Sequence, residues 1–112
     1  MFNDKELSRL RALAHSVIAL SNSKGDAQTV VTLKRGKDVV HVTVAYRPGV
    51  PKPSDAMGYL GDLADNIRSE LRLEQTSWGS ALYKTSESNF EMGLHPQFSF
   101  TISKSGAANE VD

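Results

Sequence analysis

The chain has 112 residues, of which 39% are hydrophobic and 23% are charged, and it contains no cysteine. This length allows one domain, and this composition excludes wholesale disorder, a disulfide framework and thiolate chemistry. The net charge is zero, but nine bases and four acids precede Asp55, whereas four bases and nine acids lie from Asp55 onward. No apolar run approaches the roughly 20 residues of a membrane span. The first six residues also lack the layout of a secretion signal, so we expect a cytoplasmic protein.

Residues 3–21 are predicted to form an amphipathic helix. Asn3 and Glu6 have the spacing of a capping box, in which each side chain bonds the backbone N–H of the other residue. The helix should end within residues 22–26, where Asn22 or Gly25 can adopt the left-handed conformation. Apolar residues recur at helical spacing along one face: Leu7, Leu10, Leu13, Ala14, Val17, Ile18 and Leu20.

Residues 28–34 and 38–46 are predicted to be the two strands of a β-hairpin, since both are rich in valine and threonine. We expect Gly36 to supply the positive φ of its turn. The sheet face that points away from the predicted core is mostly polar and should be open to solvent. A loop with an even number of residues places the inward residues of both strands on the same face of the sheet. These residues are Thr29, Val31, Leu33, Val40, Val42, Val44 and Tyr46.

Residues 47–55 hold three of the four prolines and are predicted to be a stiff connector. A second helix should follow over residues 55–73, with Ser54 as its N-cap. Gly58 and Gly61 lower its helix propensity, so we expect a close approach of the sheet or of the first helix there. Its predicted buried stripe consists of Met57, Leu60, Leu63, Ala64, Ile67 and Leu71.

Residues 77–94 read as a second hairpin, with its turn in residues 84–89. Trp78 opens the first strand, and Phe90 opens the second. The alternation of the second strand continues through Phe98, Phe100 and Ile102, which predicts one long strand kinked or broken at Pro96. The core face of this hairpin should include Trp78, Leu82, Phe90 and Met92.

These elements predict an α+β fold in which two amphipathic helices cover one face of an antiparallel sheet of about four strands. The order along the chain is helix, two strands, helix, two strands. Residues 1–103 should form this single domain. Residues 104–112 have no packing pattern and are predicted to be a flexible tail.

No residue pattern in the chain predicts catalysis or a cofactor. His15, His41 and His95 do not have the spacing of metal ligands. Asp62 and Asp65 are an i,i+3 pair on the solvent side of the second helix, where burial cannot split their pKa values for acid–base work. No phosphate-binding loop or nucleophile elbow occurs. We therefore expect a protein that is not an enzyme.

A basic cluster supports an alternative function in nucleic-acid binding. Lys34, Arg35 and Lys37 gather at the predicted hairpin tip, and Arg47 follows the second strand. These bases could contact phosphates. However, aromatic residues do not interleave with them, so a stacking platform for single strands is missing.

A helix rich in leucine precedes a Trp-containing strand, a polar turn and a Phe-x-hydrophobic strand. The residues that carry this pattern are Ser77, Trp78, Ser80, Leu82, Phe90 and Met92. It resembles the second half of YezG-type bacterial immunity proteins, and the preceding helix and hairpin are similar in layout. The resemblance implies a cytoplasmic, non-enzymatic protein that covers the active surface of a cognate toxin, often a nuclease.

The acidic second half of the chain suits a basic toxin surface, because complementary charges steer association. The candidate contact residues are Asp62, Asp65, Glu70, Glu87 and Glu91. A dimeric adaptor of the secretion-chaperone kind has a similar helix-and-sheet layout and stays open as a further alternative.

Overall fold

The computed structural model describes residues 2–24, 29–49, 55–74, 83–91 and 95–104, the side chains of residues 22–24, 72–74, 83 and 104 excepted. Two helices and an antiparallel sheet confirm the predicted α+β fold. In chain order the elements are α1 (Asp4–Lys24), β1 (Thr29–Arg35), β2 (Val39–Tyr46), α2 (Ala56–Glu74), β3 (Tyr83–Thr85), β4 (Asn89–Glu91) and β5 (Gln97–Lys104).

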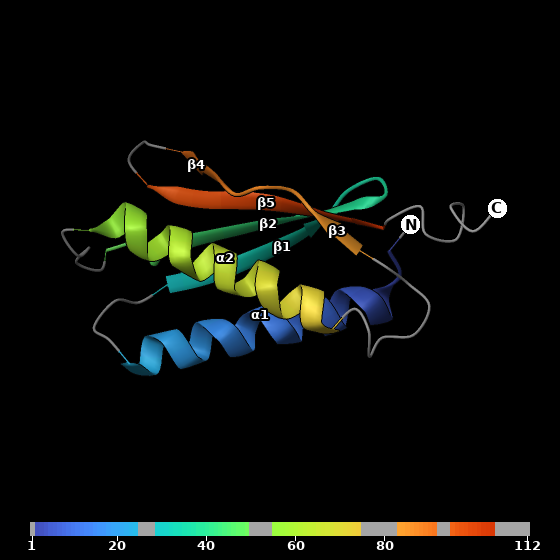
Figure 1. Cartoon of the computed structure of the whole chain (residues 1–112), viewed down its shortest axis with the longest axis horizontal. Helices are drawn as coiled ribbons and strands as arrows, with labels where there is room; N and C mark the ends of the chain where they lie inside the picture. The colour runs from blue at the N-terminus through green and yellow to red at the C-terminus, as the bar shows by residue number, and fades with distance from the viewer. Residues whose placement is uncertain (1, 25–28, 50–54, 75–82, 92–94, 105–112) are drawn as a thin grey trace.

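The sheet has the strand order β1-β2-β5-β3, and the short strand β4 also pairs with β5. All these pairings are antiparallel. Both helices lie on one face, with α1 packed on β1 and α2 packed on β5 and β2 (Figure 1). Their apolar stripes meet the inward side chains of the sheet in one cluster, in which Leu10, Val42 and Ile67 are fully buried. The predicted two-layer arrangement is therefore confirmed.

The β1–β2 hairpin has the predicted register. Thr29 faces Tyr46 and Arg35 faces Val40, so the last pair encloses an even number of residues, as predicted. Every residue of the predicted inward face is buried. The register is specific because a slip of one residue would move the whole apolar set to the solvent face.

The prediction that Gly36 supplies the positive φ of this turn is wrong. Asp38 adopts that conformation, with a φ of 59°. Aspartate tolerates it because its short side chain can hydrogen-bond locally. Gly36 instead lies in a tight space, where an added Cβ would be 3.2 Å from both His41 Nε2 and Val39 Cγ2.

α1 begins with the predicted capping box. The Glu6 N–H donates to Asn3 Oδ1 at 2.8 Å, and the Asn3 N–H donates to Glu6 Oε1 at 3.1 Å. The helix continues through Lys24, so it ends within the predicted residues 22–26. Leu20 was predicted in the buried stripe but is 63% exposed. It lies about 200° around the helix from Ile18, so both side chains cannot face the sheet.

α2 begins with Asp55 as its cap. The Gly58 N–H donates to Asp55 Oδ1 at 3.3 Å, and the Tyr59 N–H donates to the Asp55 carbonyl at 3.0 Å. Ser54, the predicted cap, lies outside the described residues. The predicted buried stripe is confirmed except at Met57, which is 55% exposed. Helical periodicity identifies a face, but it does not say how far along the helix the sheet covers that face.

The second glycine of α2 marks a close contact between the helix and the sheet. A Cβ added to Gly61 would lie 3.1 Å from the Cζ atom of Phe98 on β5. A Cβ added to Gly58 would instead meet the carboxylate of Asp55. The expected close approach is thus confirmed at Gly61, whereas Gly58 belongs to the cap.

The predicted hairpin within residues 77–94 is wrong. β3 and β4 do not pair with each other; both pair with β5, Tyr83 opposite Lys104 and Phe90 opposite Phe98. Figure 1 shows them in succession along the same edge of β5. The five strands therefore occupy four positions across the sheet, which agrees with the predicted width.

A β-bulge separates β3 from β4. The link between them has three residues, whereas only two residues separate their partners on β5. The Ser86 N–H donates to the Thr101 carbonyl at 2.9 Å, and the Thr101 N–H donates to Ser86 Oγ at 2.8 Å. Two residues of this edge, Glu87 and Ser88, thus lie opposite the single residue Phe100 of β5. The extra residue turns Phe90 toward the helices, whereas unbroken alternation from β3 would turn it toward solvent.

The prediction of one long strand kinked at Pro96 is also wrong, because the chain reverses direction between β4 and β5. The predicted inward parity is nevertheless confirmed. Phe100 and Ile102 are buried, and the half-buried ring of Phe98 lies 4.9 Å from that of Phe90, centroid to centroid. Parity did not distinguish the two paths, because an antiparallel return over an odd-numbered connection keeps the same residues on the same face.

Part of the predicted pattern lies outside the described residues. It includes the strand of Trp78, the proline-rich residues 50–54, and the chain after Lys104, which is the last residue of β5. The other predicted residues there are Gly25, Ser77, Ser80, Leu82 and Met92.

Candidate interaction surfaces

An acidic corner, defined as Asp62, Asp65 and Glu87, lies where α2 meets the bulged edge of the sheet. Asp65 Oδ1 accepts hydrogen bonds from Arg68 Nη1 at 3.0 Å and from Ser88 Oγ at 3.3 Å. The second bond joins α2 to the bulge that carries Glu87. Asp62 lies one turn before Asp65, and residues at this spacing are neighbours on a helix surface. The chain segment that carries Glu87 is thereby held beside the carboxylates of α2.

The corner has a negative balance. Its three residues are exposed, and the Asp65 side chain is 61% exposed. Among the described side chains, the cation bonded to this corner is Arg68, whose side chain is only 16% exposed and directs its Nη1 group at Asp65. Three carboxylates against one guanidinium leave an excess of two negative charges. Charges within about 8–10 Å act together at physiological salt, so the corner can attract a basic surface.

The two other predicted acids lie elsewhere. Glu70 lines a groove of about 420 Å³ between α1 and α2, together with Leu13, Val17 and Leu63. It is about 140° around α2 from Asp65, since each helical residue turns the chain by 100°. Glu91, on β4, accepts a hydrogen bond from Gln97 Nε2 at 3.0 Å. The five predicted acids therefore form one group of three and two separate positions.

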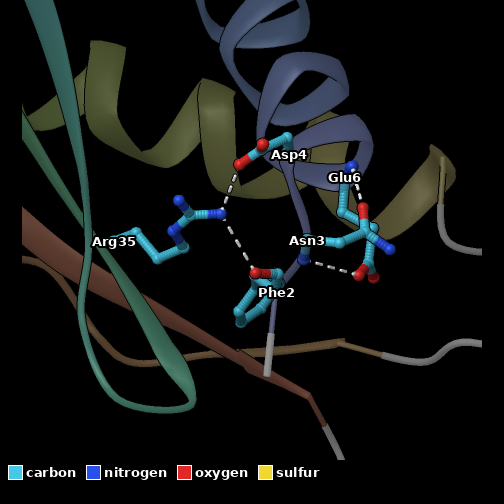
Figure 2. A network of polar contacts seen from close by, with 5 residues as sticks. All are labelled: Phe2, Asn3, Asp4, Glu6 and Arg35. Carbon is cyan, nitrogen blue, oxygen red and sulfur yellow. Dashed lines mark hydrogen bonds and ion pairs between the residues drawn. The ribbon is translucent and has the colours of Figure 1, made fainter.

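Arg35, predicted as a phosphate contact, is engaged within the fold. Its Nη1 donates to Asp4 Oδ1 at 2.7 Å and to the Phe2 carbonyl at 3.3 Å (Figure 2). These bonds connect the end of β1 to the residues that begin α1, beside the capping box of Asn3 and Glu6. We interpret Arg35 as a structural residue that links the sheet to the helix layer.

The remaining predicted bases are far apart. Lys34 and Lys37 are exposed at the tip of the β1–β2 hairpin, and Arg47 is exposed at the opposite end of β2. Six residue steps along an antiparallel strand separate these ends, or about 20 Å. The structure does not gather the four predicted bases into one patch.

The sheet face opposite the helices is polar and carries several hydroxyl groups. His41 and Thr32 are exposed there, and Thr43 and Thr101 are half-buried. This confirms the predicted open face. Among the described residues of that face no Phe, Tyr or Trp occurs, so it lacks the row of large aromatic rings on which successive bases stack.

Tyr46 is the inward residue at the end of β2. It is only 5% exposed, and no described residue is a hydrogen-bond partner of its hydroxyl. Its ring stacks on Tyr59, with centroids 6.0 Å apart, and the Tyr59 hydroxyl shares a hydrogen bond of 2.5 Å with Ser21 Oγ. Burial, together with the charges of Tyr59 and Asp55, raises the pKa of Tyr46 to about 12. A phenol held in its neutral form is a poor nucleophile, so we interpret this cluster as packing.

The sequence analysis did not identify the two residues that donate hydrogen bonds to Asp65. Arg68 lies three residues after Asp65, and this helical spacing was a readable signal for an ion pair. Ser88 had no such signal, because its bond to Asp65 spans 23 residues. Only the bulge brings it beside the helix.

Within the described residues, no three His, Cys, Asp or Glu side chains cluster as metal ligands do. Neither described helix has the length and apolar character needed to cross a membrane. A scan against protein-family models and searches of curated proteins and of solved structures give no match to this chain.

Proposed function

We propose that this protein is a non-catalytic, cytoplasmic protein-binding module that neutralises a cognate toxin by covering its active surface. The residues that resemble YezG-type immunity proteins support the immunity role. The acidic corner supports a basic partner, and nucleases bind their substrate through basic surfaces. Complementary charges across such an interface raise the association rate and favour one orientation.

The observation that carries this proposal is the hydrogen bond from Ser88 Oγ to Asp65 Oδ1 at 3.3 Å. It joins the carboxylates of α2 to the bulge at Glu87, two segments that the sequence separates. Asp65 also accepts the Arg68 bond, so its carboxylate is held in place before a partner arrives. A preorganised group loses less conformational freedom on binding than a mobile one.

The direct experiment is co-production of this chain with the product of the neighbouring gene. The proposal expects that product to arrest growth by itself and expects this chain to restore growth. The two purified proteins should form a stable complex in size-exclusion chromatography. A harmless neighbour that does not bind this chain would contradict the immunity role.

Charge reversal then tests the surface. Asp62→Lys combined with Glu87→Lys should weaken the complex about 10- to 100-fold, mainly through a slower association rate that depends on salt. Glu70→Lys is the matched control for Asp62→Lys alone, because each makes one charge reversal on α2 and Glu70 lies in the groove, outside the acidic corner. A complex that survives the double substitution but not Glu70→Lys would move the interface to the groove between the helices.

A further inference from the structure

The two edges of the sheet differ in how they are protected. The β3–β4 edge consists of two three-residue strands interrupted by a bulge. Natural proteins commonly use short strands and bulges to prevent edge pairing. β1, at the other edge, is a regular seven-residue strand with no proline, glycine or bulge, and its charges are confined to Lys34 and Arg35. In the part of the chain that the structure describes, no strand pairs with its outer side.

The hydrogen-bond pattern shows which backbone groups of β1 point outward. The Gly36 N–H donates to the Val39 carbonyl at 2.8 Å. Because bonded and non-bonded pairs alternate along an antiparallel ladder, alternate β1 residues such as Thr32 bond with β2. The N–H and C=O groups of Val31 and Leu33 therefore point away from β2. They form the repeating donor and acceptor pattern that another strand can match.

A groove runs beside this edge. It has a volume of about 400 Å³ and is lined by His15, Ile18 and Ala19 of α1, by the first residues of β1, and by Arg47. A strand added to β1 would direct alternate side chains toward the helix layer. Ile18 and Ala19 would then offer small apolar surfaces to them, and His15 a polar one.

Positive charges stand at both ends of the edge. Lys34 and Lys37 are exposed at the hairpin tip, and Arg47 is exposed at the far end. Arg35 is already paired with Asp4. The two groups of positive charge are about one strand length apart. This separation matches a seven-residue extended segment with an acidic residue at each terminus, because opposite charges on neighbouring strands stabilise their pairing.

We infer that the β1 edge binds an extended segment of another protein, which adds to the sheet as an antiparallel strand and carries an acid at each end. A second copy of this chain does not fit. Antiparallel pairing of two β1 strands would leave both α1 helices on one face above strands about 4.8 Å apart, whereas packed helices need about 8–10 Å. This surface is separate from the acidic corner and does not depend on the partner being a toxin.

Amide hydrogen exchange of the isolated protein is the first test. At low concentration the Val31 and Leu33 amides should exchange at least about 10-fold faster than the Thr32 amide, because only the latter is bonded within the sheet. Equal protection would show that the edge is already covered. Protection of Val31 and Leu33 that rises with protein concentration would show that a second copy covers it. Either result overturns the inference.

The second test adds a synthetic seven-residue peptide, acetyl-Asp-Val-Thr-Val-Thr-Val-Glu-amide, in which the three valines share one face and the two acids lie on the other. Binding should slow exchange at Val31 and Leu33, and a version with lysine at both ends should bind at least about 10-fold more weakly. Ala19→Trp fills the groove and should abolish peptide binding. Ala12→Trp is the control, since it lies on the same exposed side of α1, about 10 Å along the helix, outside the groove lining.

Four results of the second test would overturn the inference. They are no binding at millimolar peptide, binding that leaves Val31 and Leu33 unprotected, equal binding of the lysine peptide, and protection of the same amides by a DNA or RNA oligonucleotide instead. The outcome is distinguishable from that of the toxin experiment, because charge reversal at the acidic corner should leave peptide binding unchanged.

Discussion

Tyr46 combines a buried hydroxyl without a described partner with a pKa raised to about 12. Replacing it by phenylalanine removes the hydroxyl and keeps the ring that stacks on Tyr59. An unsatisfied buried hydroxyl costs about 1–3 kcal/mol. We therefore expect Tyr46→Phe to raise the free energy of unfolding by about 1 kcal/mol at pH 7, part of the gain being offset by lost contacts.

The loss of folding stability at high pH gives a second, independent magnitude for Tyr46. The folded pKa of about 12 lies above the ordinary value of 10, so the folded state favours the neutral phenol. Stability from this group is fully present below pH 10 and is lost as the pH rises toward and through 12. The two-unit difference amounts to about 3 kcal/mol in the limit, about half of which is reached at pH 11. Tyr46→Phe should lack this loss.

Urea unfolding followed by circular dichroism at pH 7, 9, 10 and 11 measures both effects. Tyr59→Phe is the matched control. It removes the bond to Ser21 and should lower stability by about 1 kcal/mol at pH 7. It should retain most of the alkaline loss, because burial is the first cause of the Tyr46 shift. If wild type and Tyr46→Phe lose stability equally between pH 10 and 11, the reasoning about Tyr46 is refuted.

Substitutions at three further positions test the fold by thermal or urea unfolding. Gly61→Val should destabilise the protein by about 1–3 kcal/mol, because its side chain would overlap the Phe98 ring; unchanged stability would mean that α2 does not lie so close to β5. Asn3→Ala should lower stability by about 1 kcal/mol through loss of the cap, and Asn3→Asp, which keeps an acceptor, should lower it less. Ser86→Ala removes the acceptor of the Thr101 N–H and should cost about 0.5–1.5 kcal/mol, with faster exchange of the Thr101 amide; a protected amide would argue against this geometry of the bulge.

The sequence predicted the first half of the fold well because its signals there are local. The capping box needs only Asn3 and Glu6, and the β1–β2 register follows from a period of two that only one loop parity satisfies. Every residue of the predicted α2 stripe is buried except Met57, which is exposed. The second half failed where topology mattered. Parity placed Phe90 and Phe98 on the same face, but it could not tell a continuous strand from a reversal.

For the candidate surfaces too, the sequence predicted local properties but not which residues lie together. Exposure and charge, which are properties of single residues, indicated Asp62, Asp65 and Glu87, and also Glu70 and Glu91, without saying which of them lie together. Their grouping was decided by the bulge.

By itself the sequence determined two amphipathic helices, one valine-rich hairpin and the faces that each of them buries. These follow from periodicity, capping and turn chemistry within about 20 residues of chain. Only the tertiary structure decided that β3 and β4 share one edge and that β1 forms the other, regular edge. It also decided that Arg35 holds α1 instead of facing a ligand. Such pairings depend on contacts between segments far apart in sequence, and several partners satisfy the same local pattern equally well until the whole sheet is assembled.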